Sequence, residues 1–575
     1  MKNILLIFML SAFICTVRPS SACTNFLVTK GASSNGSTFI TYAADSHTLY
    51  GELYFWQSAT YPDGTMLQVY EWDSGKYLGE IPQVSKTYRV VGNMNEYSLA
   101  IGETTFGGVG QLVDTTGIVD YGSLIYITLQ RAKTAREAIK VMTELVEQYG
   151  YHSSGESFSI SDPNEVWVLE MVGKGTVLKH DKKTKLTENV NKGAVWVAIR
   201  IPDGYVSAHA NQARIQTFTW SNGKTSISSK EIDKIFEPDV EVVYAHDVAQ
   251  IARDFGLYKG EDKDFSFSDT YNPVDFGGAR FCDSRVWSFF KSVNKDMWEY
   301  QDYAMGKNLT KRMPLYIKPD EKVSFEHTAA MMRDHFEGTE MDMTTDIGAG
   351  PFKIPYRWRP MSWEVDGEKF VHERAVATQQ TGFWFVAECR SSKPQPLAGI
   401  LWFATDDAAT SCLTPIYSSS ARIPEEYAVG NGDLLTYSDN AAFWVFSRVA
   451  NFAYLRYNDI SKDIVELQQE LESKYVEMVG LIDEHAQKLY AENEEKAIEF
   501  VTDFSVNTAS ATVKRWKELD RYLLVKYIDG NIKKEDNGEF VRNPNGLPVH
   551  PEHPQLPEFW RRLIKNDAGE KLKER

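Results

Sequence analysis

Cys23 is the residue of this sequence best placed to do chemistry, because it lies where an N-terminal export signal ends. It follows Ala22 and opens the segment Cys-Thr-Asn-Phe-Leu-Val. If cleavage falls after Ala22, Cys23 carries both a thiol and the free α-amine of the mature chain. A thiolate is a strong nucleophile, and an α-amine titrates near pH ~8, so it accepts a proton at neutral pH. A single residue would then supply both a nucleophile and a base.

The first 22 residues have the pattern of a signal peptide. Lys2 precedes an apolar run, Ile4 to Val17, and small residues lead up to Ala22. The apolar run is shorter than the ~20 residues that cross a membrane, and no later apolar stretch is long enough either. We therefore expect residues 1–22 to be removed, and the mature protein to be periplasmic or extracellular without a membrane span.

A cysteine directly after a signal peptide also suggests a lipid-anchored protein. Ser20 stands where a lipid-attachment box usually has an apolar residue, and the preceding Arg18 and Pro19 are untypical of such boxes. Residues 24–28 have the composition of a β-strand, whereas a lipidated cysteine usually precedes a flexible tether. These features favour a free amine on Cys23. The alternative is a lipid-anchored surface protein that binds glycans or peptides through exposed aromatic side chains.

The composition is that of a large, acidic, globular protein. The chain has 575 residues, of which 43% are hydrophobic and 13% aromatic. Its net charge is −17, and removing residues 1–22, which carry two cations and no anions, makes it −19. Such a charge is unfavourable for binding nucleic acid or an anionic membrane surface. We expect neither as a partner.

Motifs for other kinds of site are missing from the sequence. The eleven histidines are scattered without His-Glu-x-x-His spacing, and no Cys-x-x-Cys pair occurs. Residues 107–110 are glycine-rich but lack the spacing of a dinucleotide-binding loop. We therefore expect no metal and no cofactor. Three further cysteines remain in the mature chain, and Cys389 and Cys412 could form a disulfide or stay as buried thiols.

The elements that must position Cys23 are a mixture of strands and helices. Residues 24–28 and 37–43 are rich in β-forming residues and flank a Gly/Ser/Asn turn, which predicts a hairpin. Residues 133–149 have an N-terminal capping box and an apolar face, which predict a helix. Strands are also expected at 157–161, 166–171, 176–180, 195–201, 382–389 and 399–404, and helices at 247–255 and 324–336.

The composition changes near residue 440. Residues 440–457, 463–503 and 513–528 are rich in Glu, Lys, Leu and Ala, with apolar residues on one face, which predicts helices. Strands followed by helices indicate an α+β protein. The expected divisions are a signal peptide at 1–22, a catalytic domain at 23–439, a helical extension at 440–530 and a polar tail at 531–575.

Five sequence blocks point to one family. They are Cys23–Ser33 with Tyr42–His47, Met94–Thr105, Ser159–Asp162, His209–Gln212 and Gly277–Phe281. In this order they resemble the dipeptidase A and secernin family of cysteine N-terminal nucleophile hydrolases, which are related to cholylglycine hydrolases and penicillin V acylases. The resemblance implies a four-layer αββα sandwich and a thiol peptidase that cleaves small peptides, a dipeptidase. The helical extension would cover one side of this core or form the contact of a homo-oligomer.

The resemblance also implies roles for individual residues. Cys23 would attack the scissile carbonyl while its own α-amine takes the thiol proton. Asp45 corresponds to an aspartate that holds the amine, although it could instead be a turn or helix-cap residue. Asn211 corresponds to an asparagine whose amide donates to the oxyanion, although it could instead form an Asx-turn.

Two further roles and the substrate follow from the same comparison. Arg280 corresponds to a buried arginine that supports the cysteine, and Arg285, five residues on, competes for that role. Thr105 falls where the relatives place a second oxyanion donor or substrate contact, although it could be a plain strand residue. The bile-acid hydrolases have an arginine where this chain has Tyr42. This favours peptides as substrates, with N-acyl amides such as conjugated bile acids or acyl-amino acids as the alternative.

Overall fold

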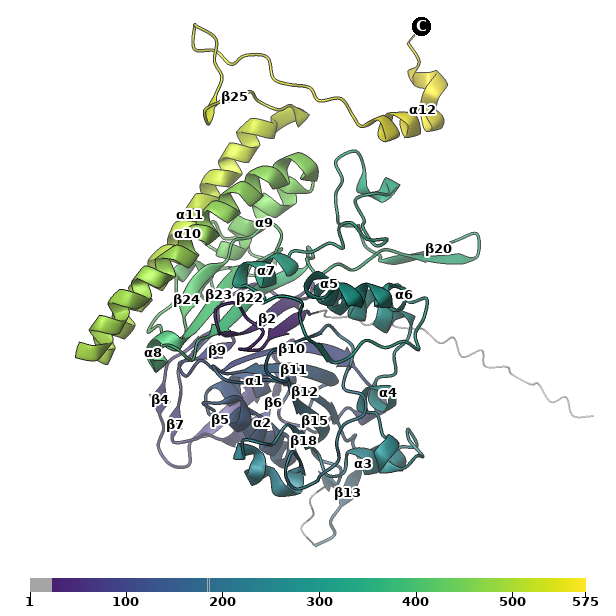
Figure 1. Ribbon diagram of the computed structural model, residues 1–575, viewed down its shortest axis with the longest axis vertical. Helices are drawn as coiled ribbons and strands as arrows, with labels where there is room; N and C mark the ends of the chain where they lie inside the picture. Colours follow the sequence, from purple (N-terminus) through teal and green to yellow (C-terminus); the bar gives the residue numbers. More distant parts are fainter. Residues whose placement is uncertain (1–22, 184, 186, 575) are drawn as a thin grey trace, which may run out of the picture.

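Two large β-sheets with helices around them make up the protein (Figure 1). The computed structural model describes residues 23–574 apart from 184 and 186, so the expected signal peptide lies outside the described residues. The mixture of helices and sheets expected from the sequence is confirmed. Among the described residues, no helix combines the length and the apolar composition needed to cross a membrane.

The first sheet has seven strands and contains the predicted hairpin. Strands β1 (Asn25–Val28) and β2 (Thr38–Asp45) pair antiparallel, with Leu27 opposite Ile40. The order of the sheet is β19-β16-β1-β2-β22-β23-β24. The other five strands are β16 (Val206–His209), β19 (Tyr316–Ile317), β22 (Thr381–Cys389), β23 (Gly399–Thr405) and β24 (Thr414–Tyr417). Strands β2, β22 and β23 are buried along their whole length, because both faces of the sheet are covered.

The second sheet has nine strands, in the order β17-β18-β15-β12-β11-β10-β9-β8-β3. Its longest strands are β10 (Ala100–Gly107), β11 (Gly155–Ser161), β12 (Val166–Gly173) and β15 (Ala194–Arg200). The shorter ones are β3 (Phe55–Trp56), β8 (Val90–Val91), β9 (Met94–Asn95), β17 (Ser226–Ser228) and β18 (Val242–Tyr244). The strand expected at 176–180 is β13 (Leu178–His180), which pairs with β14 (Thr187–Asn189) in a separate exposed hairpin.

The two sheets pack face to face, and helices cover their outer faces. Strand β2 of the first sheet contacts β10 and β11 of the second. Helices α1 (Tyr121–Leu129) and α2 (Ala135–Tyr149) pack on the second sheet, whereas α5 (Ser284–Val293) and α7 (Phe325–Met331) pack on the first (Figure 1). The helix predicted at 133–149 is α2, and its capping Thr134 accepts from the Glu137 backbone N–H as the sequence predicts.

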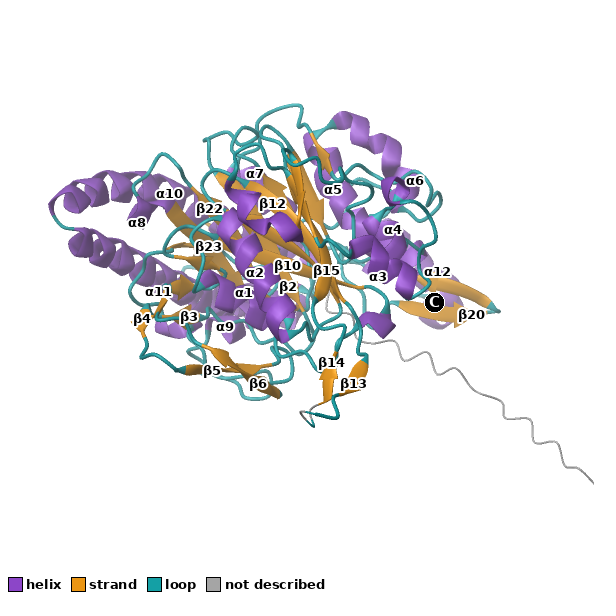
Figure 2. Cartoon of the chain, turned by 90° about the horizontal axis from the view of Figure 1, so that it is seen from below, coloured by secondary structure: helices purple, strands orange, loops and turns teal. Residues whose placement is uncertain are grey.

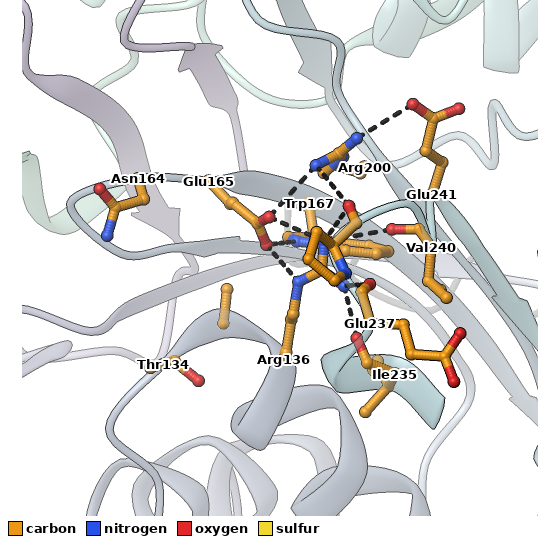
Figure 3. Close-up of polar contacts among 12 residues, drawn as sticks. Thr134, Arg136, Asn164, Glu165, Trp167, Arg200, Ile235, Glu237, Val240 and Glu241 are labelled. Atoms are coloured by element: carbon orange, nitrogen blue, oxygen red, sulfur yellow. Dashed lines mark hydrogen bonds and ion pairs between the residues drawn. The ribbon is translucent and has the colours of Figure 1, made fainter. Parts of the chain in front are cut away.

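Arg136 anchors the start of α2 to the second sheet (Figure 3). Its guanidinium binds both oxygens of Glu165, in the turn between β11 and β12, at 2.7 Å each. The same guanidinium donates to the Glu237 carbonyl at 2.7 Å, and Arg200 of β15 binds Glu165 from the other side at 3.3 Å. These charge-assisted contacts hold the helix layer in register with the strands. They lie away from Cys23 and serve the fold.

Residues 442–527 form a helical layer on the first sheet. Helices α9 (Ala442–Ala453), α10 (Tyr457–Glu492) and α11 (Glu494–Tyr527) follow one another, and α10 and α11 lie side by side (Figures 1 and 2). Helix α11 packs on β24. Asp483 of α10 binds Arg390, which follows β22, at 2.7 Å. The helical layer therefore covers the sheet, and it continues into an exposed tail with a last helix, α12 (Glu558–Leu572).

The predicted boundaries within this layer are wrong at one point. The sequence predicts that the helix is interrupted between residues 503 and 513. In the structure the interruption lies at Asn493, between α10 and α11, and the Asn493 side chain caps α11 by accepting from the Lys496 N–H. The Ser- and Thr-rich stretch stays helical because its hydroxyls bond back to the preceding turn and to the sheet. Ser505 Oγ, for example, accepts from the backbone N–H of Tyr417 in β24 at 3.0 Å.

Candidate active site

A cavity of about 280 Å³ opens beside Cys23, between the two sheets and α1. Cys23 lies just before β1 and is buried, and its side chain lines the cavity. Much of the wall is aromatic, made of Tyr42, Tyr54, Trp72, Tyr121, Tyr126 and Phe383. A cavity lined by apolar rings and a few polar groups is the usual form of a small-molecule site. The other cysteines among the described residues are free thiols too, so Cys389 and Cys412 do not form a disulfide.

The pairing of β1 with β16 brings Asn211 to Cys23. Asn25 lies opposite His209 in this antiparallel pair, and extending the register by two residues puts Cys23 opposite Asn211. The Cys23 backbone nitrogen donates to Asn211 Oδ1 at 2.9 Å. Asn211 has a φ of 60°, a left-handed conformation that Asn tolerates better than most residues. Two predicted site residues are therefore in direct contact through the atom that cleavage would convert to an amine.

Asp45 lies at the end of β2, close to Cys23. Its buried carboxylate accepts from Thr381 Oγ1 at 2.7 Å and forms an ion pair with Arg374 at 3.6 Å. Burial raises the pKa of Asp45 to about 7, although Arg374 and Thr381 oppose the shift. Asp45 is near enough for its charge to contribute to the raised pKa of Cys23. The Cys23 nitrogen itself is held by Asn211, so Asp45 acts on the site through its charge.

Arg285, and not Arg280, is the arginine at Cys23. Arg280 lies in a π-helical turn, Gly278–Asp283, and binds Glu373 at 2.8 Å. Arg285, in α5, is fully buried and donates to the Cys23 carbonyl at 2.6 Å and to Asn211 Oδ1 at 2.8 Å. Five residues do not complete a whole number of helical turns, so the two side chains leave different faces of the helix. The assignment of Arg280 to the cysteine was therefore wrong.

Thr105 reaches the site through its backbone. Its carbonyl oxygen accepts from Asn211 Nδ2 at 2.7 Å, while its hydroxyl donates to Glu156 Oε1 at 2.8 Å. The Asn211 amide is thereby held in one orientation, with Oδ1 toward the Cys23 nitrogen. The Thr105 hydroxyl, which the sequence suggested as an oxyanion donor, is turned toward Glu156.

A buried carboxylate lies next to the thiol. Glu103 Oε1, on β10, is 3.6 Å from Cys23 Sγ and accepts from the Tyr42 hydroxyl at 2.5 Å. Burial, followed by the charges of Glu103 and Asp45, raises the pKa of the Cys23 thiol well above its usual value. The thiol is therefore protonated at rest and needs a base to become a nucleophile.

Glu103 lies close to a second buried carboxyl, that of Glu156 on the neighbouring strand β11. Burial raises the pKa of both carboxyls, and the charge of Glu103 raises that of Glu156 further. Both carboxyls therefore hold a proton more tightly than a free carboxyl does, and Glu156 more so than Glu103.

Comparison with known proteins identifies the family of the chain. Residues 22–470 match the family model described as peptidase family C69. The chain belongs to this family. A probable dipeptidase A of Streptococcus pyogenes serotype M3 (strain SSI-1) is 22% identical over 481 residues, covering 79% of this chain and 87% of the relative. A probable dipeptidase of Latilactobacillus sakei is 21% identical over 511 residues, covering 84% of this chain and 90% of the relative.

Among solved structures, a penicillin V acylase from Agrobacterium tumefaciens matches with a TM-score of 0.19 and 15% identity, over 30% of this chain and 52% of that chain. The resemblance to the dipeptidase family and the expectation of a peptidase are confirmed by the C69 match, and the chain is a peptidase of that family. Cys23 is the second residue of the matched region.

Glu103, whose carboxyl lies 3.6 Å from the Cys23 thiol, is the residue beside Cys23 that the sequence did not predict. It lies inside the block Met94–Thr105, and strand alternation puts it on the same face of β10 as Thr105, which was singled out. Tyr42 was noted only as a departure from the bile-acid hydrolases. An acid buried in an otherwise apolar strand was the signal that could have found Glu103, since such residues are rarely buried without a function or a partner.

Proposed function

We propose that this C69 peptidase is an exported cysteine hydrolase that cleaves the amide bond of dipeptides, with Cys23 as nucleophile and its own α-amine as general base. The observation that carries the proposal is the Cys23 nitrogen held 2.9 Å from Asn211 Oδ1, while the thiol of the same residue lines the cavity. Two relatives that match this chain over 87% and 90% of their own length are named as probable dipeptidases, which supports dipeptides as the substrate class.

The first step of the proposed reaction takes the proton from the thiol. Once residues 1–22 are removed, the Cys23 nitrogen is an amine that donates one hydrogen to Asn211 and keeps a lone pair. The lone pair accepts the Sγ proton, directly or through a water, and the thiolate attacks the peptide carbonyl carbon. The amine then gives the proton to the leaving nitrogen, and a thioester forms on Sγ. Water hydrolyses the thioester by the same proton path in reverse.

Neighbouring groups support these steps in different ways. Arg285 fixes the Cys23 carbonyl and Asn211 Oδ1, so the nitrogen and the thiol keep one relative position. Asp45 adds negative charge that favours the protonated amine after the first step. The role of Asn211 as an oxyanion donor belongs to the proposal as well, and its amide is oriented for that role by the Thr105 carbonyl.

We also propose a fold type and a location for the protein. The two face-to-face sheets, with α1 and α2 on one side and α5, α7 and the C-terminal helices on the other, support a four-layer αββα sandwich of the N-terminal nucleophile hydrolase type. Export to the periplasm or the medium is supported by the signal-like sequence of residues 1–22. Removal of that segment would free the amine without any self-cleavage.

Substitution of Cys23 tests the proposal. Cys23→Ala should abolish hydrolysis of a dipeptide panel, whereas Cys412→Ala, which removes a buried thiol away from the cavity, should keep activity. Thermal denaturation of both variants checks that they fold. Dipeptide hydrolysis by folded Cys23→Ala would contradict the proposal. Turnover of glycine or taurine conjugates in preference to dipeptides would replace the substrate class and leave the nucleophile standing.

A further inference from the structure

The cavity beside Cys23 is acidic. The ionisable side chains that line it include Asp45, Asp73 and Glu103, and no lysine, arginine or histidine lies among the described lining residues. Glu103 is at the buried base, next to the thiol, and Asp73 is exposed, at the mouth. Asp73 is held in place by the Tyr121 hydroxyl, which donates to its Oδ1 at 2.8 Å. The cavity thus offers carboxylates at both ends.

The Glu103 carboxyl at the base lacks a cationic partner among the described residues. Its Oε1 accepts from the hydroxyl of Tyr42 and from the Cys23 thiol, whereas its buried Oε2 has no hydrogen-bond partner in the part of the chain that the structure describes. Within the described chain, neither Glu103 nor the neighbouring Glu156 forms an ion pair. A buried carboxylate is costly unless it is paired and hydrogen-bonded. This points to a cation supplied from outside, through the cavity.

Three of the aromatic residues that line the cavity, Tyr54, Trp72 and Tyr126, pack against one another. Trp72 lies with its ring centroid 4.8 Å from that of Tyr54 and 4.6 Å from that of Tyr126. Aromatic faces attract an ammonium group and also pack against apolar side chains. The volume of about 280 Å³ is at the small end of ligand pockets, which span about 300–1,000 Å³. It suits one amino-acid residue better than a long acyl chain.

We propose that this cavity binds the free α-ammonium and the first side chain of the substrate, with Glu103 as the carboxylate that receives the ammonium and Asp73 as a second negative charge at the mouth that attracts it. The inference rests on the proposed function and names its substrate class: peptides with an unblocked N-terminus and an apolar first residue. N-acylated substrates would leave the buried charge of Glu103 unpaired.

The geometry around the thiol fits this arrangement. In a peptide, the α-nitrogen is two bonds, about 2.5 Å, from the first carbonyl carbon. A carbonyl placed for attack lies about 3–3.5 Å from Sγ. Glu103 Oε1 is 3.6 Å from Sγ. The ammonium of the substrate residue whose carbonyl is attacked can therefore come within reach of Glu103. The scissile bond would therefore be the first peptide bond of the substrate.

Binding of the ammonium would also prepare the nucleophile. The charge of Glu103 is one cause of the raised pKa of Cys23. An ammonium beside Glu103 offsets that charge and favours the thiolate. The substrate with a free N-terminus would then be both better bound and more readily attacked.

Paired substrates test the inference. We expect the mature enzyme to prefer Phe-Ala over N-acetyl-Phe-Ala and over 3-phenylpropanoyl-Ala by about 100-fold or more in kcat/KM, because the last two lack the ammonium. Glu103→Gln keeps an oxygen that can accept from Tyr42 but removes the carboxylate, so it should cut this preference to about tenfold or less. Asp73→Asn should reduce it less, and Asp63→Asn, an exposed turn residue outside the cavity, should leave it unchanged. A wild-type enzyme that prefers either blocked substrate would overturn the inference while the proposed hydrolase stands.

A binding measurement separates this inference from the reaction itself. Calorimetric titration of Cys23→Ala with phenethylamine should show binding that 2-phenylethanol, its neutral analogue, lacks. Adding Glu103→Gln to that variant should weaken phenethylamine binding by about tenfold or more. Equal binding of the amine and the alcohol would overturn the inference. If no peptide is hydrolysed in a Cys23-dependent way, the proposed function fails, and this titration alone decides whether the cavity is an ammonium site.

Discussion

Replacing Arg285 by lysine should damage the site far more than replacing Arg280 by lysine. Arg285 donates to five acceptors, three of which hold the site: the Cys23 carbonyl at 2.6 Å, Thr24 Oγ1 at 2.7 Å and Asn211 Oδ1 at 2.8 Å. A lysine keeps the charge but ends in a single nitrogen on a flexible chain, so it cannot span these positions. Two of the three contacts would be lost.

The size of the effect follows from those contacts. A hydrogen bond from a charged group contributes about 1.5–3 kcal/mol, so losing two removes about 3–6 kcal/mol of interaction that holds Cys23 and Asn211 together. Part of this is recovered by relaxation, and about 3–4 kcal/mol corresponds to a fall of roughly 10²–10³ in kcat/KM, since each ~1.4 kcal/mol is tenfold. Arg280→Lys retains an ion pair with Glu373, so its kcat/KM should change by less than about tenfold.

The assay is dipeptide hydrolysis by both variants in the mature form, with thermal denaturation as the check on folding. Arg280→Lys is the matched control, because it makes the same chemical change five residues away. If Arg280→Lys lost more activity than Arg285→Lys while both were folded, the placement of Arg285 as the residue that fixes Cys23 would be refuted.

Three further predictions test other parts of the account. Tyr42→Phe removes the donor to Glu103, so it should lower the unfolding free energy by about 1–3 kcal/mol in urea denaturation, and an unchanged value would contradict that hydrogen bond. Asp45 has a native pKa of about 7, against about 3.9 unfolded, so between these values the native state holds the extra proton and its stability falls as pH rises. Asp45→Asn has no carboxyl to titrate, so it does not lose this stability. From pH 5 to pH 8 its unfolding free energy, measured relative to wild type, should therefore increase by about 2–3 kcal/mol. Parallel curves of unfolding free energy against pH for the two proteins would be inconsistent with the raised pKa of Asp45. Ending the chain at residue 439 strips α9, α10 and α11 from the first sheet and should abolish soluble, folded protein in a size-exclusion assay, whereas a soluble and active 23–439 fragment would show that the helical layer is dispensable.

Local sequence signals predicted the elements around Cys23 well. The hairpin of β1 and β2 and the capped helix α2 follow from β-forming residues, a turn and a capping box, which act within a few residues. The block containing Asn211 was identified from family resemblance, and the β1–β16 register shows why it meets Cys23. Local patterns and the order of the five sequence blocks were sufficient here.

The features that were missed depend on contacts distant in sequence. Whether Arg280 or Arg285 reaches Cys23 is decided by the rotation of one helix against the sheet, which no short motif encodes. The break at Asn493 was hidden because tertiary contacts keep the Ser- and Thr-rich part of α11 helical. The proximity of Glu103 to Glu156 required the register of β10 and β11.

The central claim, that Cys23 works with its own free amine, is tested most directly by the N-terminus of the protein. Two forms should be compared: one that begins at Cys23 and one that carries a single methionine before it. Thiol titration and thermal denaturation would show that both are folded with the same reactive cysteine. We predict that the form beginning at Cys23 hydrolyses dipeptides and that the extended form is at least about 100-fold slower, because an amide nitrogen cannot accept the thiol proton. Equal activity of the two forms would contradict it.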